Sequence, residues 1–244
     1  MIYVFEHHDR LLSLWREQDR REIRLAHIDF HDDLRGLLVD RVKGCTYPIR
    51  SLACGEAAVD PGNFLAHAVL EGRVESVRWV HGAIGGRAYD MGIVRYESDL
   101  FALPQRLRQA LTGTTCIPLE FEESLLDDWG GPTDTELLSI DWDCFASILL
   151  DAGGIEQRAS GFLDRLGTQV PQDSYVCYSP EYSHPSLDAF RGFVKELSSR
   201  FDQPVDWVEP GLAQGRTRPA AVETELPSGP LGRLILALRR RGIY

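Results

Sequence analysis

The sequence predicts an α/β protein with three layers, in which a mostly parallel β-sheet carries helices on both faces. Short β-rich segments alternate with amphipathic helical segments along the chain, and this is the pattern of sheets built from strand–helix–strand units. The chain has 244 residues, which is enough for one large domain of this kind. We therefore expect a single domain over residues 1–244.

Apolar segments rich in β-branched and aromatic residues mark the expected strands. They are residues 2–5, 25–28, 76–80, 115–121, 137–140, 175–178 and 205–208. Apolar residues at helical spacing mark the expected helices. They are residues 11–15, 60–72, 104–111, 155–166, 185–201 and 231–240, of which the second has Asp60 as N-cap, Pro61 in its first turn and Gly72 as its stop. The Gly-rich residues 82–86 and the irregular residues 211–229 are expected to be loops.

Composition excludes several classes of function. The net charge is −11, which argues against a nucleic-acid binder because such proteins carry a basic surface. No apolar run is long enough to span a membrane, and the first residues lack the features of a signal peptide. We therefore expect a cytoplasmic protein without a membrane partner.

The five cysteines stand far apart and form no C-x-x-C pair. This spacing argues against a zinc ribbon or a redox motif. In the expected compartment, reduced and mostly buried thiols are the simplest interpretation. The cysteines are Cys45, Cys54, Cys116, Cys144 and Cys177.

Two acidic segments directly follow apolar strand-like runs. Asp29, His31 and Asp33 alternate in the first, and Asp141 and Asp143 alternate in the second. Alternating residues in an extended chain share one face. The carboxyl ends of parallel strands form the edge at which ligands bind in open α/β sheets. We therefore expect the four carboxylates and the imidazole to converge at that edge.

Such a cluster is typical of a metal centre. Several like charges in one place are costly unless a cation neutralises them. Carboxylate and imidazole ligands without thiolates suit manganese, iron or zinc, and four carboxylates exceed the needs of one ion. Two ions that share carboxylates lower the pKa of a water molecule between them. The alternative is a pair of solvated acidic turns, in which the aspartates cap helices.

A further candidate ligand follows the first strand, in the segment Glu6-His7-His8-Asp9. The topology brings the end of this strand to the same edge of the sheet. We favour His8 as the ligand and keep His7 as the alternative.

These motifs resemble the ureohydrolase family, the group of arginase and agmatinase. That family carries D-x-H-x-D after one strand and S-x-D-x-D after a later one, with a further His upstream. The matches here are residues 29–33, residues 139–143 and His8. The chain differs from arginases proper because it is shorter, lacks their G-G-D-H segment, and has Cys-Phe-Ala at 144–146 where they carry a further Asp-Pro.

Four segments look closer to a divergent branch, the peptide arginases, which convert arginine side chains within peptides to ornithine and urea. They are residues 4–8, 27–34, 63–80 and 138–143. The resemblance implies the arginase–deacetylase fold, an arginine-containing peptide substrate and two Mn²⁺ ions, and it allows a homo-oligomer. Hydroxide between the ions would attack the guanidinium carbon, and Asp143, acting through the metal-bound water, would protonate the leaving amine. The implied ligands are Asp29 and Asp141 as bridges, His8 and Asp33 on one ion, and His31 and Asp143 on the other.

Three further residues are candidates for the site. Arginases place an acidic residue after a late strand to hold the guanidinium group, and Glu181 is the best match; the alternative is an exposed surface carboxylate. His27 stands two residues before Asp29, so it could support catalysis beside the metal ligands or be a core histidine. Asn63 could orient the substrate or serve the start of its helix.

Three other functions compete with a peptide arginase. The chain could act on free arginine or agmatine. It could be an amide deacetylase, whose relatives share the fold and usually hold one zinc ion. It could also be a non-enzymatic maturation partner that binds a leader peptide, although intact residues at all six ligand positions argue against a degenerate site.

Overall fold

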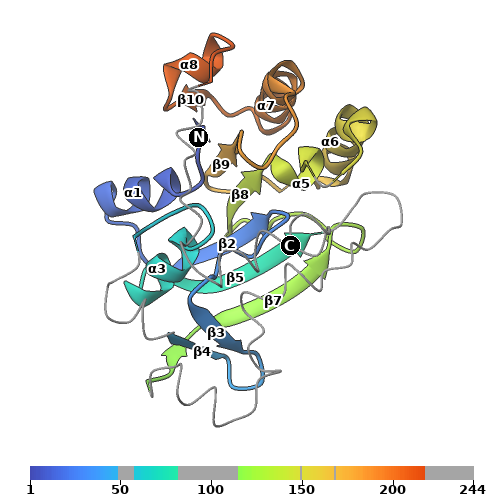
Figure 1. Ribbon diagram of the computed structural model, residues 1–244. Coiled ribbons are helices and arrows are strands. Elements are labelled where there is room, and N and C mark those ends of the chain that lie inside the picture. Colours follow the sequence, from blue (N-terminus) through green and yellow to red (C-terminus); the bar gives the residue numbers. More distant parts are fainter. Residues whose placement is uncertain (49–57, 82–114, 149, 168, 218–244) are drawn as a thin grey trace, which may run out of the picture.

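The computed structural model describes residues 1–48, 58–81, 115–148, 150–167 and 169–217, and in this part of the chain it confirms the predicted fold class. Seven strands form one sheet in the order β10-β1-β9-β8-β2-β5-β7, and every neighbouring pair is parallel. Figure 1 shows this sheet with its strands pointing the same way. The strands are β1 (Ile2–Phe5), β2 (Ile23–Ile28), β5 (Val74–His81), β7 (Glu120–Leu125), β8 (Leu137–Asp141), β9 (Ser174–Cys177) and β10 (Val205–Trp207).

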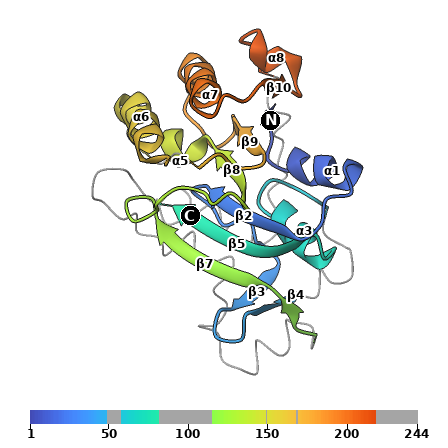
Figure 2. The ribbon, with the colours of Figure 1, turned by 180° about the vertical axis from the view of Figure 1, so that it is seen from behind.

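Helices pack on both faces of the sheet, which gives the three predicted layers (Figure 1 and, from behind, Figure 2). One face is covered by α1 (Arg10–Glu17) and α3 (Phe64–Leu70), and the other by α6 (Ile155–Arg165) and α7 (Leu187–Phe201). Three short helices complete the helices among the described residues: α5 (Asp143–Ala146), the 3-10 helix η3 (Ala152–Gly154) and α8 (Pro210–Ala213).

Two buried clusters of apolar side chains hold the layers together. In β2, Leu25 belongs to the cluster beneath α1 and α3, whereas Ala26 and Ile28 belong to the cluster beneath α6 and α7. This alternation follows from the pleat of the strand, in which successive side chains point to opposite faces. His27 therefore lies on the α1–α3 face, where its ring contacts that of Phe64.

A second, three-stranded sheet was not predicted. It consists of β3 (Leu37–Asp40), β4 (Cys45–Pro48) and β6 (Ile117–Pro118) in antiparallel pairs. The prediction of one continuous strand over 115–121 is therefore wrong, because this segment belongs to two separate strands. The chain pairs with β4 through Ile117–Pro118, bends at the buried Leu119, and then enters the large sheet as β7.

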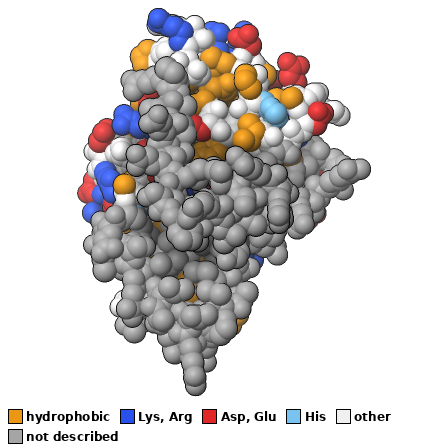
Figure 3. Space-filling model, viewed as in Figure 1, with side chains coloured by type: hydrophobic (Ala, Val, Ile, Leu, Met, Phe, Trp, Pro, Cys, Tyr) orange, Lys and Arg blue, Asp and Glu red, His pale blue; other side chains and the backbone are white. Residues whose placement is uncertain are grey.

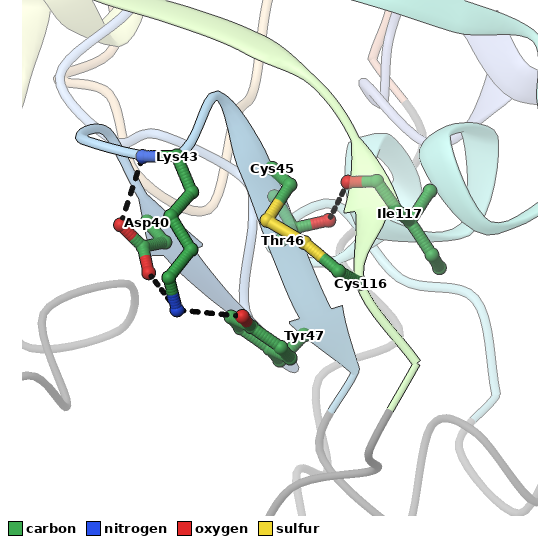
Figure 4. Close-up of a disulfide and its surroundings, with 7 residues drawn as sticks. All are labelled: Asp40, Lys43, Cys45, Thr46, Tyr47, Cys116 and Ile117. Carbon is green, nitrogen blue, oxygen red and sulfur yellow. Dashed lines mark hydrogen bonds and ion pairs between the residues drawn. A yellow bond between two sulfur atoms is a disulfide. The ribbon is translucent and has the colours of Figure 1, made fainter.

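The small sheet also corrects the expectation that the cysteines are reduced. Cys45 and Cys116 form a disulfide, shown in Figure 4 with the surrounding residues. Pairing of β4 with β6 brings their Cα atoms to 5.9 Å, which is within the usual range for disulfides. Because this pairing joins residues far apart in sequence, spacing alone does not reveal it. Cys144 and Cys177 are buried free thiols as predicted, and Cys54 lies outside the described residues.

Several predictions fall outside the part of the chain that the structure describes. They are the loop at 82–86, the helices at 104–111 and 231–240, residues 218–229, and the single domain over the whole length. Of residues 211–229, those up to 217 are described, and they include most of α8. No helix among the described residues is both long and apolar enough to cross a membrane.

Candidate metal centre

Four strands that are neighbours in the sheet place polar side chains at its carboxyl edge. The strands β1, β9, β8 and β2 lie in this order, and each is followed by candidate site residues. The convergence predicted from the two acidic motifs is therefore present in the structure. The residues are His7 and His8 after β1, Ser179 and Glu181 after β9, Asp141 and Asp143 at the end of β8, and Asp29, His31 and Asp33 after β2.

One group of ligand atoms surrounds the imidazole of His8. Its Nδ1 atom lies 3.2 Å from Asp29 Oδ2, 3.3 Å from Asp33 Oδ2 and 3.1 Å from Asp141 Oδ2. All four residues are buried. On the other side of the ring, Nε2 lies 2.8 Å from Ser139 Oγ. If this nitrogen donates to the serine oxygen, Nδ1 presents its lone pair to the carboxylates, as a metal ligand must.

A second group lies on the other side of Asp29. His31 Nδ1 is 3.1 Å from Asp143 Oδ2 and 3.7 Å from Asp29 Oδ1. Asp29 thus turns Oδ2 towards the His8 group and Oδ1 towards the His31 group. Two sets of three ligand residues, His8–His27–Asp29 and Asp29–His31–Asp143, share this carboxylate. A shared carboxylate is the arrangement that joins two ions in binuclear centres.

Local backbone hydrogen bonds explain the two-residue spacing of the acidic motifs. Asp29 Oδ1 accepts from the amide of His31 at 2.7 Å, and Asp141 Oδ1 accepts from the amide of Asp143 at 3.0 Å. Each aspartate therefore caps the turn that follows its own strand. Asp33 has a positive φ of 51°, a conformation that aspartate tolerates better than most residues. The turns direct alternate side chains to the same point.

Burial and mutual charge shift the pKa values of these groups in opposite directions. Burial lowers the pKa of His8, but the carboxylates of Asp141, Asp29 and Asp33 outweigh it and raise the pKa well above its usual range. Burial likewise lowers the pKa of His31, and Asp143 and Asp29 outweigh it to give a raised value. The cluster without metal therefore binds protons where a metal ion would bind.

The carboxylates show the same competition. Burial raises the pKa of Asp143 well above its usual range, and the charges of Asp141 and Asp29 raise it further. For Asp33, burial raises the pKa, but the nearby imidazoles of His27 and His8 outweigh it and lower the pKa to about 2. A cation at this point would favour the ionised form of every carboxylate.

The buried atoms at the centre fit a metal ion better than they fit each other. Several ligand atoms have no hydrogen-bond partner among the described residues, and their ion pairs join only carboxylates and imidazoles. A buried polar atom without a partner costs free energy, and a cation would satisfy these atoms together. They are His8 Nδ1, His27 Nε2, Asp29 Oδ2, Asp33 Oδ2 and Asp143 Oδ2.

The structure separates the two candidate histidines after β1. His7 lies apart from the carboxylate cluster and pairs with Glu181, with 3.3 Å between Nδ1 and Oε1. The hydrogen bond with Glu181 raises the pKa of His7 against the effect of burial. Burial raises the pKa of Glu181, and hydrogen bonding with His7 reverses this to a net lowering. Glu181 Oε2 is buried and has no hydrogen-bond partner among the described residues.

The two remaining candidates lie in different surroundings. His27 is fully buried and its Nε2 faces the oxygens of the first group, and the sequence left this position open beside that of a core histidine. Asn63 lies at the start of α3, where its Oδ1 accepts from the amide of Asp60 and its Nδ2 donates to the carbonyl of Ala58, both at 2.8 Å. The amide group thus serves the start of its helix, and a role in substrate binding stays a prediction.

Four residues around the centre received no role from the sequence. Ser139 and Ser179 contact His8 and Asp141 respectively, and Ser179 Oγ donates to Asp141 Oδ2 at 2.5 Å. The alternation of Ser139 with Asp141 was a signal in the sequence for Ser139. Nothing in the sequence marks Ser179. The ring of Phe64 packs against those of His8 and His27, and the ring of Tyr182 packs edge-on against His31.

A surface hollow lies elsewhere. It has a volume of about 760 Å³ and lies beside the first residues of α6 and α7, where Tyr178, Ser186 and Leu187 line it. Figure 3 shows hydrophobic side chains gathered on the upper part of one face, which Figure 1 assigns largely to the helices α5 to α8. None of the described residues that line the hollow belongs to the metal-ligand cluster, so we assign it no part in the chemistry.

Comparisons with known proteins give partial similarities. The sequence matches no protein-family model and no curated protein. Similar solved structures include proclavaminate amidino hydrolase from Streptomyces clavuligerus, with 14% identity and a TM-score of 0.44. They also include a hypothetical agmatinase from Burkholderia thailandensis (16%, 0.42) and arginase from Medicago truncatula (13%, 0.42).

The alignments cover 82%, 82% and 81% of this chain, but only 62%, 58% and 57% of those structures. The chain therefore spans about three fifths of their length. Because the structural similarity is low, we base the function on the side chains of the candidate metal centre.

Proposed function

We propose that this chain is a metal-dependent amidinohydrolase that converts arginine side chains within a peptide to ornithine and urea. The observation that carries the proposal is the pair of ligand groups that share Asp29. Two divalent ions, which we take to be Mn²⁺, suit these carboxylate and imidazole ligands. When bound, they supply a nucleophile near neutral pH by lowering the pKa of water.

Six residues would hold the ions. Asp29 and Asp141 would be shared, because both come from strands at the centre of the site. Ser139 and Ser179 would orient two of the ligands through the hydrogen bonds described above. Such supporting contacts fix ring orientation and usually matter for metal affinity. The proposed ligands are His8, Asp29, His31, Asp33, Asp141 and Asp143.

Glu181 is our candidate for the group that receives the substrate guanidinium. One of its carboxylate oxygens is paired with His7, and the other is buried without a hydrogen-bond partner among the described residues. A carboxylate accepts parallel hydrogen bonds from the planar guanidinium group, which fixes its orientation. This would hold the guanidinium carbon beside the two ligand groups.

Asp143 is our candidate for proton transfer to the leaving amine. Its Oδ2 faces His31, whose side chain is 36% exposed and so lies at the open side of the centre. A proton held there is close to the side from which a substrate can enter.

A peptide substrate is favoured over free arginine by the surface beside His31. Tyr182 and Ile148 are 42% and 55% exposed, and the amide of Ile148 donates to the carbonyl of Tyr182 at 2.9 Å. The two apolar side chains therefore come from adjacent backbone, and the Tyr182 ring contacts His31. They could contact residues that flank an arginine whose side chain enters the site.

The test combines metal content with product analysis. We would load the protein with Mn²⁺, measure metal per chain, and assay urea from an arginine-containing peptide and from free arginine. We expect about two ions per chain and urea from the peptide alone, with both lost in Asp141→Ala. A matched control is Asp134→Ala, which changes an exposed aspartate in the turn before β8.

Other outcomes assign other functions. Urea from free arginine or agmatine would indicate a small-molecule ureohydrolase. Release of acetate from an acetyl-lysine peptide would indicate a deacetylase. A protein that binds metal and a peptide but releases none of these products would support the non-enzymatic maturation partner. Failure to bind metal after loading would refute the binuclear centre.

A further inference from the structure

We infer that His27 is a direct ligand of the ion on the His8 side, in addition to the six residues above. This inference rests on the metal centre of the proposed function, but not on the reaction. It makes the two halves of the centre unequal. One half would hold two imidazoles, from His8 and His27, and the other would hold one, from His31.

The first observation is the state of the His27 side chain. It is fully buried, and neither ring nitrogen has a hydrogen-bond partner among the described residues. A core histidine normally satisfies at least one nitrogen through a hydrogen bond. A metal ion would satisfy Nε2, which is the nitrogen that faces the carboxylates.

The second observation is the spacing of the ligand atoms. His27 Nε2 lies 3.4 Å from Asp29 Oδ2 and 3.5 Å from Asp33 Oδ2. His8 Nδ1 lies 3.2 and 3.3 Å from the same two oxygens. An ion with ligand bonds of about 2.1 Å holds neighbouring ligand atoms roughly 3.0–3.5 Å apart. The four atoms are therefore spaced like neighbours around one ion.

The third observation is the support of the two rings. The ring of Phe64 in α3 lies 4.8 Å from that of His8 and 6.2 Å from that of His27, and the two imidazoles are 5.3 Å apart. This packing on the α1–α3 face holds both imidazoles with a nitrogen towards Asp29 and Asp33. Apolar packing of this kind fixes the orientation of a ligand before the ion binds.

Unequal halves have a measurable consequence. The half with His8 and His27 should bind its ion more tightly than the half with His31, because it offers one more nitrogen and lies deeper in the protein. Titration of the metal-free protein with Mn²⁺, followed by the electron paramagnetic resonance signal of free Mn²⁺, should therefore show two classes of site. The variant His27→Phe keeps a ring against Phe64. In this variant the Mn²⁺ affinity of the tighter class of site should fall by more than about 100-fold, and that of the weaker class should be unchanged.

A residue that only orients another ligand could also weaken binding, so the test needs a signal from the ligand itself. We would load the protein with Co²⁺ and count the paramagnetically shifted imidazole N–H protons in the NMR spectrum. We expect three in the wild type and two in His27→Phe, with His31→Asn as the matched loss from the other half. Circular dichroism would check folding, and His27→Gln provides a second variant if His27→Phe does not fold.

The results distinguish the role of His27 as a metal ligand from the proposed hydrolase activity. An unchanged number of shifted imidazole protons in His27→Phe, or unchanged Mn²⁺ affinities, would overturn the role of His27 and leave the hydrolase standing. Loss of one imidazole signal in a protein that releases no urea would support His27 as a ligand and refute the hydrolase. A wild type that binds neither Mn²⁺ nor Co²⁺ would refute both.

Discussion

The two halves of the proposed metal centre differ in their access to solvent. The half around His8 and His27 is buried and packs against Phe64. The half around His31 has a side chain that is 36% exposed and lies beside the exposed Tyr182. If the centre binds two ions as proposed, the buried half should hold its ion more firmly, and the open half should meet the substrate.

The largest effect is expected from a substitution of Asp29, the residue that the two halves share. Asp29 belongs to both ligand groups, so Asp29→Asn should weaken the binding of both ions by more than about 100-fold and abolish urea release. Isothermal titration with Mn²⁺ measures this directly. Asp134→Asn is the matched control. Retention of one tightly bound ion in Asp29→Asn would show that the halves are independent.

The next effect concerns stability and pH. In the metal-free protein, the raised pKa values of His8 and His31 mean that each binds its proton more tightly in the folded state. Their stabilisation is complete below the unfolded-state pKa of about 6.5 and is lost as the pH rises through the folded-state pKa. The free energy of unfolding of the metal-free protein should therefore fall as the pH rises above about 6.5.

Metal should reverse this trend, because Mn²⁺ competes with protons for the same atoms and binds better as the pH rises. Urea denaturation with EDTA and with excess Mn²⁺ measures both slopes. His8→Asn and His31→Asn should each reduce the pH dependence of the free energy of unfolding of the metal-free protein. The ratio of the two reductions compares the two halves of the site. A metal-free protein that gains stability over this range would contradict the assignment.

A smaller effect tests the open half alone. Glu181→Gln removes the charge that we expect to receive the guanidinium group, so KM for the peptide should rise by roughly 10- to 100-fold, as for the loss of a charged hydrogen bond. The metal content and both Mn²⁺ affinities should stay at the wild-type values. Loss of metal in this variant would place Glu181 among the ligands instead.

The smallest effect concerns the partner of Glu181. The side chain of His7 is 33% exposed, so its pairing with Glu181 is weak and His7→Gln should raise KM only about two- to fivefold. His7→Ala should have a larger effect, because glutamine can still donate a hydrogen bond to the carboxylate. Steady-state kinetics of the two variants gives the comparison. A large fall in metal content in either variant would revive His7 as a metal ligand.

Most of the large sheet and the position of the site could be predicted from the sequence. The strands that end at the site are short apolar segments, and the carboxyl ends of parallel strands share an edge whatever their order. The two-residue spacing in Asp29–Asp33 and Asp141–Asp143 reflects turns that are local in sequence. Local signals of this kind are visible without knowledge of the fold.

The parts that were missed depend on contacts between distant residues. The small sheet and its disulfide join Cys45 to Cys116 across 71 residues, and no local pattern encodes that pairing. The packing of Phe64 against the two histidines also follows from tertiary structure alone. The sequence could not distinguish His7 from His8, because both follow β1 and only their surroundings in the folded chain differ.

The place of β8 in the sheet has a consequence for the order in which the centre can form. This strand lies between β9 and β2, and it brings Ser139 to His8 across 131 residues of chain. During synthesis, the ribosome releases the ligands of β1 and β2 long before those of β8. The complete ligand set exists only after β8 has paired with β2, so a growing chain could not retain both ions earlier. Metal loading would then be a late step of biosynthesis. The bound ions would cross-link segments that are remote along the chain.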